Sequence, residues 1–328
     1  MINKRIQNKV AESKLSLPLA LIYGILVFLV CWLGVQHGNL LSFAFLGVPT
    51  FLLMLLNNTY ALIRIFSRMV SCSFLFLSAM LLALPGLGSA SEPATLLLDV
   101  PWGADLVQVC FIVFFILLFS TYQNKNAVGQ VFAAFFCLGM ASMAFPHIVF
   151  MLPMCWFLLA VYMLAMSVKT FLASLFGFSV PYWFLSAYSV YTGRFMLVPH
   201  HFETIAVFGQ VGNVASLGLN RVAMLCWVVL LALTGAVHFL RYSYQDKIRT
   251  RMEYEAFMLT VFVITLFLVL QPQHFDTLMR LLMVVTAPLV GHFIALTHSK
   301  LSNISFLFMV LATLLLTAFN LWMPSFSF

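Results

Sequence analysis

The sequence predicts an all-α protein, a polytopic bundle of about eleven transmembrane helices with a cytoplasmic amino terminus and an external carboxyl terminus. Composition indicates the class, because 63% of the 328 residues are hydrophobic, 8% are charged and the mean hydropathy is +1.07. Soluble domains contain about 25% charged residues, so this composition is typical of an integral membrane protein. The distribution of Lys and Arg between the apolar runs gives the orientation.

A helix that crosses a bilayer needs about 20 mostly apolar residues, and the chain contains many such runs. They leave almost nothing for a soluble domain, so we expect one transmembrane domain over residues 1–328, with long external loops at about 88–104 and 192–221. The expected spans are residues 17–33, 40–56, 69–87, 105–122, 127–145, 148–166, 171–191, 222–240, 254–270, 278–297 and 304–323.

Basic residues sort to one side when these spans alternate across a membrane. Only Arg194, Arg221 and Arg280 fall on the outer side. Cytoplasmic loops carry an excess of Lys and Arg, which places the amino terminus inside. The inner segments hold the other thirteen: Lys4, Arg5, Lys9, Lys14, Arg64, Arg68, Lys125, Lys169, Arg241, Lys247, Arg249, Arg251 and Lys300.

All nine carboxylates map to loops or span ends in this topology. Ion-coupled carriers generally keep charged groups inside the bundle, so their position disfavours such a carrier. His292 is the one ionisable residue expected at depth. It either relays protons or forms a hydrogen bond with a neighbouring helix.

Small residues recur every four positions in the fifth expected span, at Gly129, Ala133, Cys137 and Ala141. Small side chains on one face let two membrane helices approach closely. We therefore expect this face to pack tightly against a neighbouring span.

The two external loops contain the candidate site. Carboxylates beside an apolar cavity act as general bases, and Arg and His side chains hold phosphate groups on a lipid-linked substrate. Solvated loop charges without a chemical role are the alternative interpretation. The candidate catalytic residues are Asp99, Asp105 and Glu203, and the candidate substrate-binding residues are Arg194, His200, His201 and Arg221.

Neither a metal site nor a cofactor is expected. His200 and His201 are adjacent, so their side chains diverge in a strand and in a helix. The six cysteines lie in or beside apolar runs without a CxxC pair, which favours packing over disulfides. Signatures for phosphate loops, zinc proteases, serine hydrolases and dinucleotide binding are lacking. The net charge of +7 is scattered among apolar segments, so nucleic acid is not an expected partner.

Residues 126–193 contain Asn-Ala-Val-Gly, then Gly-Met-Ala-Ser-Met-Ala-Phe-Pro and later Gly-Phe-Ser-Val-Pro-Tyr. This stretch, about a fifth of the chain, resembles an uncharacterised family of bacterial multi-pass membrane proteins. The resemblance implies an inner-membrane location and assigns neither an activity nor catalytic residues.

Three functions remain open. The first is an enzyme or assembly factor that acts on a lipid-linked substrate at the outer face; the outline looks like the membrane core of polyprenyl-phosphate-dependent glycosyltransferases or glycan polymerases. The second is a permease or flippase without buried ion-coupling charges. The third is a structural subunit of a membrane complex. The expected partners are the lipid bilayer, a lipid-linked or amphipathic substrate, and other membrane subunits.

Overall fold

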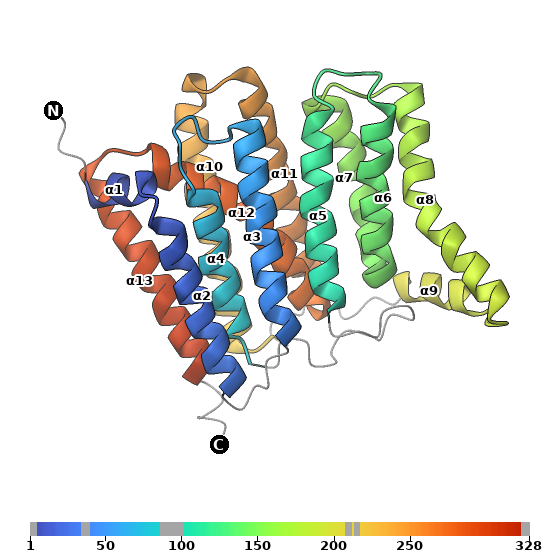
Figure 1. Ribbon diagram of the computed structural model, residues 1–328, viewed down its shortest axis with the longest axis horizontal. Coiled ribbons are helices and arrows are strands. Elements are labelled where there is room, and N and C mark those ends of the chain that lie inside the picture. Colours follow the sequence, from blue (N-terminus) through green and yellow to red (C-terminus); the bar gives the residue numbers. More distant parts are fainter. Residues whose placement is uncertain (1–4, 34–39, 86–101, 207–211, 213–216, 323–328) are drawn as a thin grey trace. The chain divides into compact units, whose positions relative to one another are not determined.

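The computed structural model describes residues 5–33, 40–85, 102–206, 212 and 217–322, and the fold in these ranges is all-α (Figure 1). Thirteen α-helices lie within them. Their bounds are α1 Ile6–Glu12, α2 Ser16–Leu33, α3 Leu40–Tyr60, α4 Met69–Leu82, α5 Gly103–Ser120, α6 Val128–Ala144, α7 Leu152–Phe157, α8 Val168–Tyr191, α9 Leu197–Ile205, α10 Leu219–Tyr242, α11 Ile248–Leu270, α12 Phe275–Leu296 and α13 Lys300–Trp322. Short segments of other helix types are η1 Pro146–Met151, η2 Leu158–Tyr162, η4 Ser243–Gln245 and η5 Pro272–His274.

The chain forms two compact units. Unit 1 comprises Met1–Leu87, Val214–Thr265 and Leu282–Phe328, and unit 2 comprises Gly88–Asn213 and Leu266–Leu281. Helices α11 and α12 therefore contribute residues to both units.

In unit 1, α4 packs against α2, α3 and α13. Two glycines bring α12 close to its neighbours: a Cβ on Gly235 of α10 would lie 2.7 Å from the Leu289 carbonyl oxygen, and one on Gly291 would lie 2.9 Å from the Val70 nitrogen of α4. Such distances are too short for a side chain, so these backbones touch directly. As a result 89% of the α12 span is buried.

One end of unit 1 gathers four connecting segments. The Gln7 side chain of α1 donates to Ile294 O and Thr297 Oγ1, and the Ser67 hydroxyl donates to Ala11 O. Arg64, before α4, contacts the connector between α10 and α11. The basic residues of these segments therefore share one end, as the alternating topology requires. Which side of the membrane this end faces stays a prediction.

In unit 2, α6 packs between α5 and α8 (Figure 1). Ser167 caps α8, since its hydroxyl accepts a hydrogen bond from the Thr170 backbone N–H. Further along, α6 and α8 touch where each carries a glycine. A Cβ on Gly139 would lie 2.6 Å from the Phe178 carbonyl oxygen, and one on Gly177 would overlap the Phe132 carbonyl oxygen.

The expectation of eleven spans is wrong in number, since seven helices of the described residues are long and apolar enough to cross a membrane. Helices α4 and α6 have 14 and 17 residues, hence lengths of about 21 and 26 Å, below a hydrocarbon core of roughly 30 Å. The expected span 148–166 is divided among η1, α7 and η2, because Pro146 and Pro153 start new helical segments. The expected span 40–56 falls in α3, where side chains before residue 46 lie outside the described residues.

The predicted stripe of small residues is also only partly correct. Gly129 has nothing within 4 Å of its Cβ position, and Ala133 and Cys137 are half-buried. The α6 glycine in close contact with α8 is instead Gly139, which lies outside the four-residue repeat.

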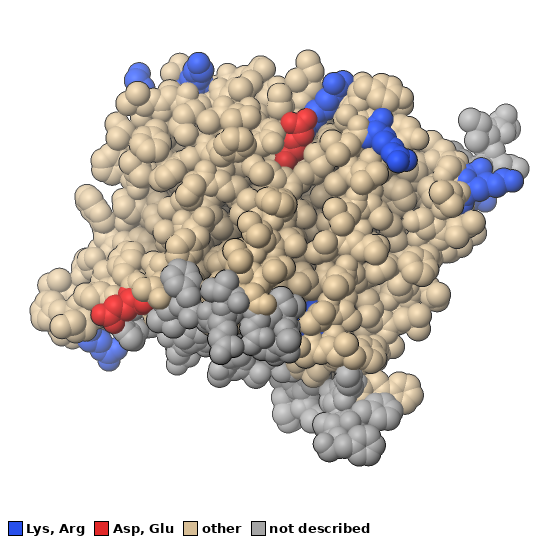
Figure 2. Space-filling view, turned by 180° about the vertical axis from the view of Figure 1, so that it is seen from behind, with Lys and Arg blue, Asp and Glu red and all other residues tan. Residues whose placement is uncertain are grey.

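Uncharged side chains form most of the face in Figure 2, with Lys and Arg near its margins. Large apolar side chains such as Leu19, Phe184 and Leu315 are more than half exposed. Surfaces of this kind face lipid in membrane proteins and are rare on soluble ones. The chain is therefore a multi-pass helical membrane protein.

The glycine contact between α6 and α8 predicts a clear substitution effect. Gly177→Ala places a methyl group against the Phe132 carbonyl, so the detergent-solubilised protein should lose about 1–3 kcal/mol of stability through overpacking. Gly129→Ala is the matched control and should leave the unfolding temperature unchanged, because its Cβ position is open. Equal unfolding temperatures for both variants would contradict the packing.

Candidate functional site

The structure distributes the predicted external residues over both units. In unit 2, Asp105 begins α5, Arg194 lies in the turn after α8, and His201 and Glu203 lie on α9. Arg194 and Glu203 are exposed, while His201 is fully buried. Arg221, on α10, belongs to unit 1. Asp99 and the side chain of His200 lie outside the described residues.

Asp105 forms an ion pair with Arg280 of α12. Both side chains are largely buried, with exposed fractions of 5% and 17%. A buried carboxylate needs such a partner, because transfer of an isolated charge out of water costs several kcal/mol. Asp105 therefore has a structural partner that the sequence did not reveal, although Arg280 was expected on the same side of the membrane.

His201 closes a short polar chain that runs from α6 to α9. The Ser142 and Tyr182 hydroxyl oxygens are 2.7 Å apart, and the Tyr182 hydroxyl lies 3.4 Å from His201 Nε2. Burial lowers the pKa of His201 from its usual 6.5, since the charged imidazole loses its water. The residue thus helps to dock α9 on unit 2 as a neutral side chain.

Unit 2 also contains two buried histidines whose rings are in contact, and the sequence did not predict this contact. The rings of His147, on η1, and His274, on η5, have centroids 4.1 Å apart, and both residues are 2% exposed. Phe145 packs against the His274 ring at 5.2 Å. Both histidines belong to short segments that begin with proline, Pro146 and Pro272, but nothing in their spacing indicated the contact.

Unit 1 contains a buried group of ionisable residues, here called the Asp246 cluster: Arg64, His238, Asp246, Tyr254 and His292. His292 Nε2 lies 3.1 Å from Asp246 Oδ2, and both side chains are almost fully buried. Arg64 Nε approaches Asp246 Oδ1 at 3.5 Å and is 35% exposed. His292 was expected at depth and Asp246 at a loop or span end, so their pairing was not predicted.

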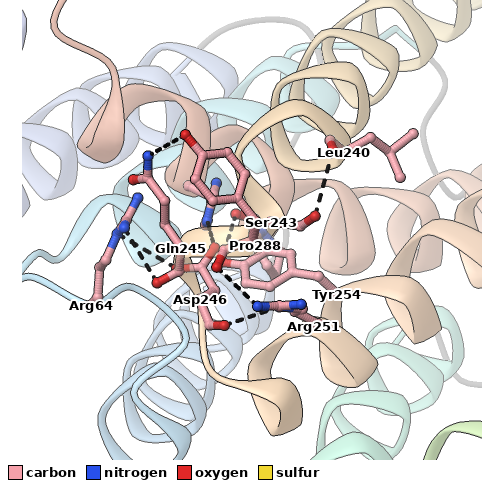
Figure 3. Close-up of polar contacts among 10 residues, drawn as sticks. Arg64, Leu240, Ser243, Gln245, Asp246, Arg251, Tyr254 and Pro288 are labelled. Atoms are coloured by element: carbon pink, nitrogen blue, oxygen red, sulfur yellow. Dashed lines mark hydrogen bonds and ion pairs between the residues drawn. The ribbon is translucent and has the colours of Figure 1, made fainter.

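The connector before α11 holds Asp246 in place (Figure 3). Arg251 donates from Nε to the Asp246 carbonyl oxygen at 3.0 Å and from Nη2 to the Tyr244 carbonyl oxygen at 2.9 Å. Arg64 reaches the same loop from the segment before α4 (Figure 3). This basic connector therefore folds inward around its only acid, Asp246.

Glu253, one turn into α11, is also fully buried. Its Oε1 accepts a hydrogen bond from Arg249 Nε at 2.9 Å, and the Arg249 guanidinium lies over the Tyr60 ring. With Asp105, Asp246 and Asp276, four carboxylates expected at loops or span ends are thus buried. Their positions near span ends agree with the sequence, but their burial was not expected.

A cavity of about 230 Å³ lies within unit 1. Its walls come from α1, α2, α4, α10, α12 and α13, and they are almost entirely apolar. The Ser73 hydroxyl, on the α4 wall, is buried and has no hydrogen-bond partner among the described residues. Leu19, on the α2 wall, is 64% exposed, so the cavity reaches the surface of the unit there.

Among the described residues, no three His, Cys, Asp or Glu side chains are grouped closely enough to hold a metal ion. Comparison of the chain with protein-family models, curated proteins and solved structures gives no match. The resemblance of residues 126–193 to a bacterial membrane family therefore gains no support from these comparisons.

The ion pair between Asp105 and Arg280 predicts how substitutions of these residues change the stability of the protein. Asp105→Asn leaves the Arg280 charge buried without its carboxylate, and loss of one partner of a buried pair typically costs about 3–5 kcal/mol. The apparent unfolding temperature in detergent should fall sharply. The double variant Asp105→Leu with Arg280→Leu should recover much of this loss, and the exposed control Lys300→Gln should show none. A double variant as unstable as the single one would contradict the ion-pair explanation.

The buried position of His201 predicts a pH effect. Above about pH 6.5 the residue is neutral in the folded and unfolded states; as the pH falls below that value, only the unfolded chain readily takes up the proton. His201 should therefore destabilise the fold between about pH 6.5 and 5. Thermal unfolding across this range should show a smaller decrease for His201→Gln than for the wild type, and parallel curves would exclude the effect.

Proposed function

We propose that this multi-pass membrane protein binds a lipid-linked substrate and acts on it as an enzyme or assembly factor. The observation that carries the proposal is the apolar cavity of unit 1. A cavity of about 150 Å³ with apolar walls stays dry and binds benzene, so one of 230 Å³ has room for a ring-sized or branched segment of a hydrocarbon chain.

Two details of the cavity fit a substrate with a chain and a polar group. The exposed Leu19 places one wall at the lipid-facing surface, where a chain already dissolved in the bilayer can enter. The Ser73 residue lies in the cavity wall, and its hydroxyl is buried without a hydrogen-bond partner among the described residues, which costs about 1–3 kcal/mol until a polar group reaches it.

The candidate residues of the external loops are proposed separately from the cavity, because Asp105, Arg194, His201 and Glu203 belong to unit 2 and the cavity belongs to unit 1. Asp99, Asp105 and Glu203 are the proposed catalytic residues, and Arg194, His200, His201 and Arg221 are the proposed binding residues. An inner-membrane location in a bacterium, with a cytoplasmic amino terminus, completes the proposal. The gathering of basic residues at one end of unit 1 supports the alternating topology on which this orientation depends.

A photoreactive polyprenyl phosphate tests the cavity. Full-length protein in nanodiscs should be labelled on α2, α4 or α13, as mapped by mass spectrometry. Ala20 is 1% exposed and lines the cavity, so Ala20→Phe should reduce labelling by about tenfold, equivalent to ~1.4 kcal/mol. The control is Leu21→Phe, because Leu21 is exposed and lies outside the cavity wall.

Unchanged labelling of Ala20→Phe would overturn the cavity as the binding site. Labelling that is competed equally well by ordinary phospholipid would instead indicate a bilayer-lipid site and favour the structural-subunit alternative. Flux of the probe across vesicles containing the protein, without its conversion, would favour the permease or flippase alternative.

A further inference from the structure

His292 occupies a fully enclosed position on α12. It is 0% exposed, and aromatic rings surround it: Tyr254 at 4.8 Å, His238 at 5.4 Å and Phe239 at 5.5 Å between ring centroids. The adjacent Gly291 packs against the α4 backbone at Met69 and Val70. An ionisable residue in such a place within a membrane helix is costly to keep and marks a functional position.

The hydrogen bonds of His292 define its neutral form. Nε2 faces Asp246 Oδ2 at 3.1 Å, whereas Nδ1 is buried and has no hydrogen-bond partner among the described residues. A carboxylate accepts a hydrogen bond, so the neutral ring carries its proton on Nε2. Nδ1 then presents an unused lone pair inside the protein.

Asp246 is itself held from the opposite side. Its Oδ1 faces Arg64, which is 35% exposed at the end of unit 1, and its carbonyl oxygen accepts a hydrogen bond from Arg251. The carboxylate is thus fixed against the imidazole rather than free to turn toward water. A buried histidine oriented by a carboxylate on one nitrogen is the arrangement that stabilises a proton on the other.

We propose that His292 Nδ1 is a proton-binding site within unit 1, and that Asp246 is the positioning residue that fixes the tautomer and balances the charge of the imidazolium. Proton uptake from water forms one N–H bond at Nδ1, and release to water breaks it. No other bond changes. The site goes beyond the proposed function, because it requires no lipid-linked substrate.

Charged and titratable groups face this site from every element that packs around it. Asp246 and Arg64 are the charged groups here, and the ring of His238 of α10 lies 5.4 Å from that of His292. Tyr254 of α11 contributes a hydroxyl that donates to the Pro288 carbonyl oxygen at 3.4 Å. From α4, the backbone of Met69 and Val70 contacts the adjacent Gly291.

Histidine-selective ring ¹⁵N NMR of the full-length protein in nanodiscs tests the site between pH 5 and 9. One signal, absent in His292→Gln, should convert from the neutral Nε2–H tautomer to the imidazolium as the pH falls. In Asp246→Asn the transition of the same signal should change, because the carboxylate beside the ring is lost. The exposed-residue control, His298→Gln, should leave this transition unchanged.

Two results would overturn the proposal: a His292 signal that stays in one form across the whole range, or an identical transition in wild type and Asp246→Asn. The amide of Asp246→Asn can still hydrogen-bond to the ring, so this variant separates proton binding from a purely structural contact. If His292→Gln does not fold, the one signal displaced in Asp246→Asn identifies His292. Because no substrate is present, failure here is distinct from failure of cavity labelling.

Discussion

The enclosure of α12 is the constraint on which the rest of unit 1 depends. A membrane helix that faces lipid cannot carry unpaired polar groups, because lipid offers no hydrogen bonds. α12 escapes this limit, since most of its surface is covered by protein. Two glycines bring neighbouring backbones close enough to exclude lipid. Gly291 of α12 lies against α4, and Gly235 of α10 lies against α12. Within that enclosure His292 meets the Asp246 carboxylate in unit 1, and the part of α12 that belongs to unit 2 carries Arg280, which pairs with Asp105.

The sequence predicted the class of the protein and the grouping of its basic residues, because both depend on features summed over many positions. Hydropathy windows report average polarity, and topology follows from charge counts in loops. The predicted number of spans was wrong because an average hydropathy does not show where a helix breaks. One apolar run is divided into η1, α7 and η2, with prolines at the start of the first two only, and α4 ends at Leu82 although apolar residues continue. The prediction of the residues between α6 and α8 was incomplete for a related reason. A repeat of small residues shows where close packing is possible, but the partner helix determines that Gly139 makes the contact.

The candidate site was likewise predicted only in part. Asp105, His201 and Glu203 were recognised as chemically suitable residues, and the structure gives two of them specific partners in unit 2. The Asp246 cluster could not be recognised in this way. His292 and Asp246 are 46 positions apart, and Arg64 is farther still. A single sequence contains no signal that an acid in a basic connector will fold against a histidine in the next helix but one. Burial of Asp246 and Glu253 was therefore missed, although each lies close to a span end as expected.

The cavity and the Asp246 cluster lie on different faces of α12. Val290 and Ile294, which line the cavity, are four residues apart and so share one face of the helix. His292 lies two positions from each, a rotation of about 200°, and therefore points away from the cavity. A hydrocarbon chain in the cavity cannot touch the imidazole. The proposed lipid-binding cavity and the proposed proton-binding site of unit 1 therefore lie on opposite faces of one helix.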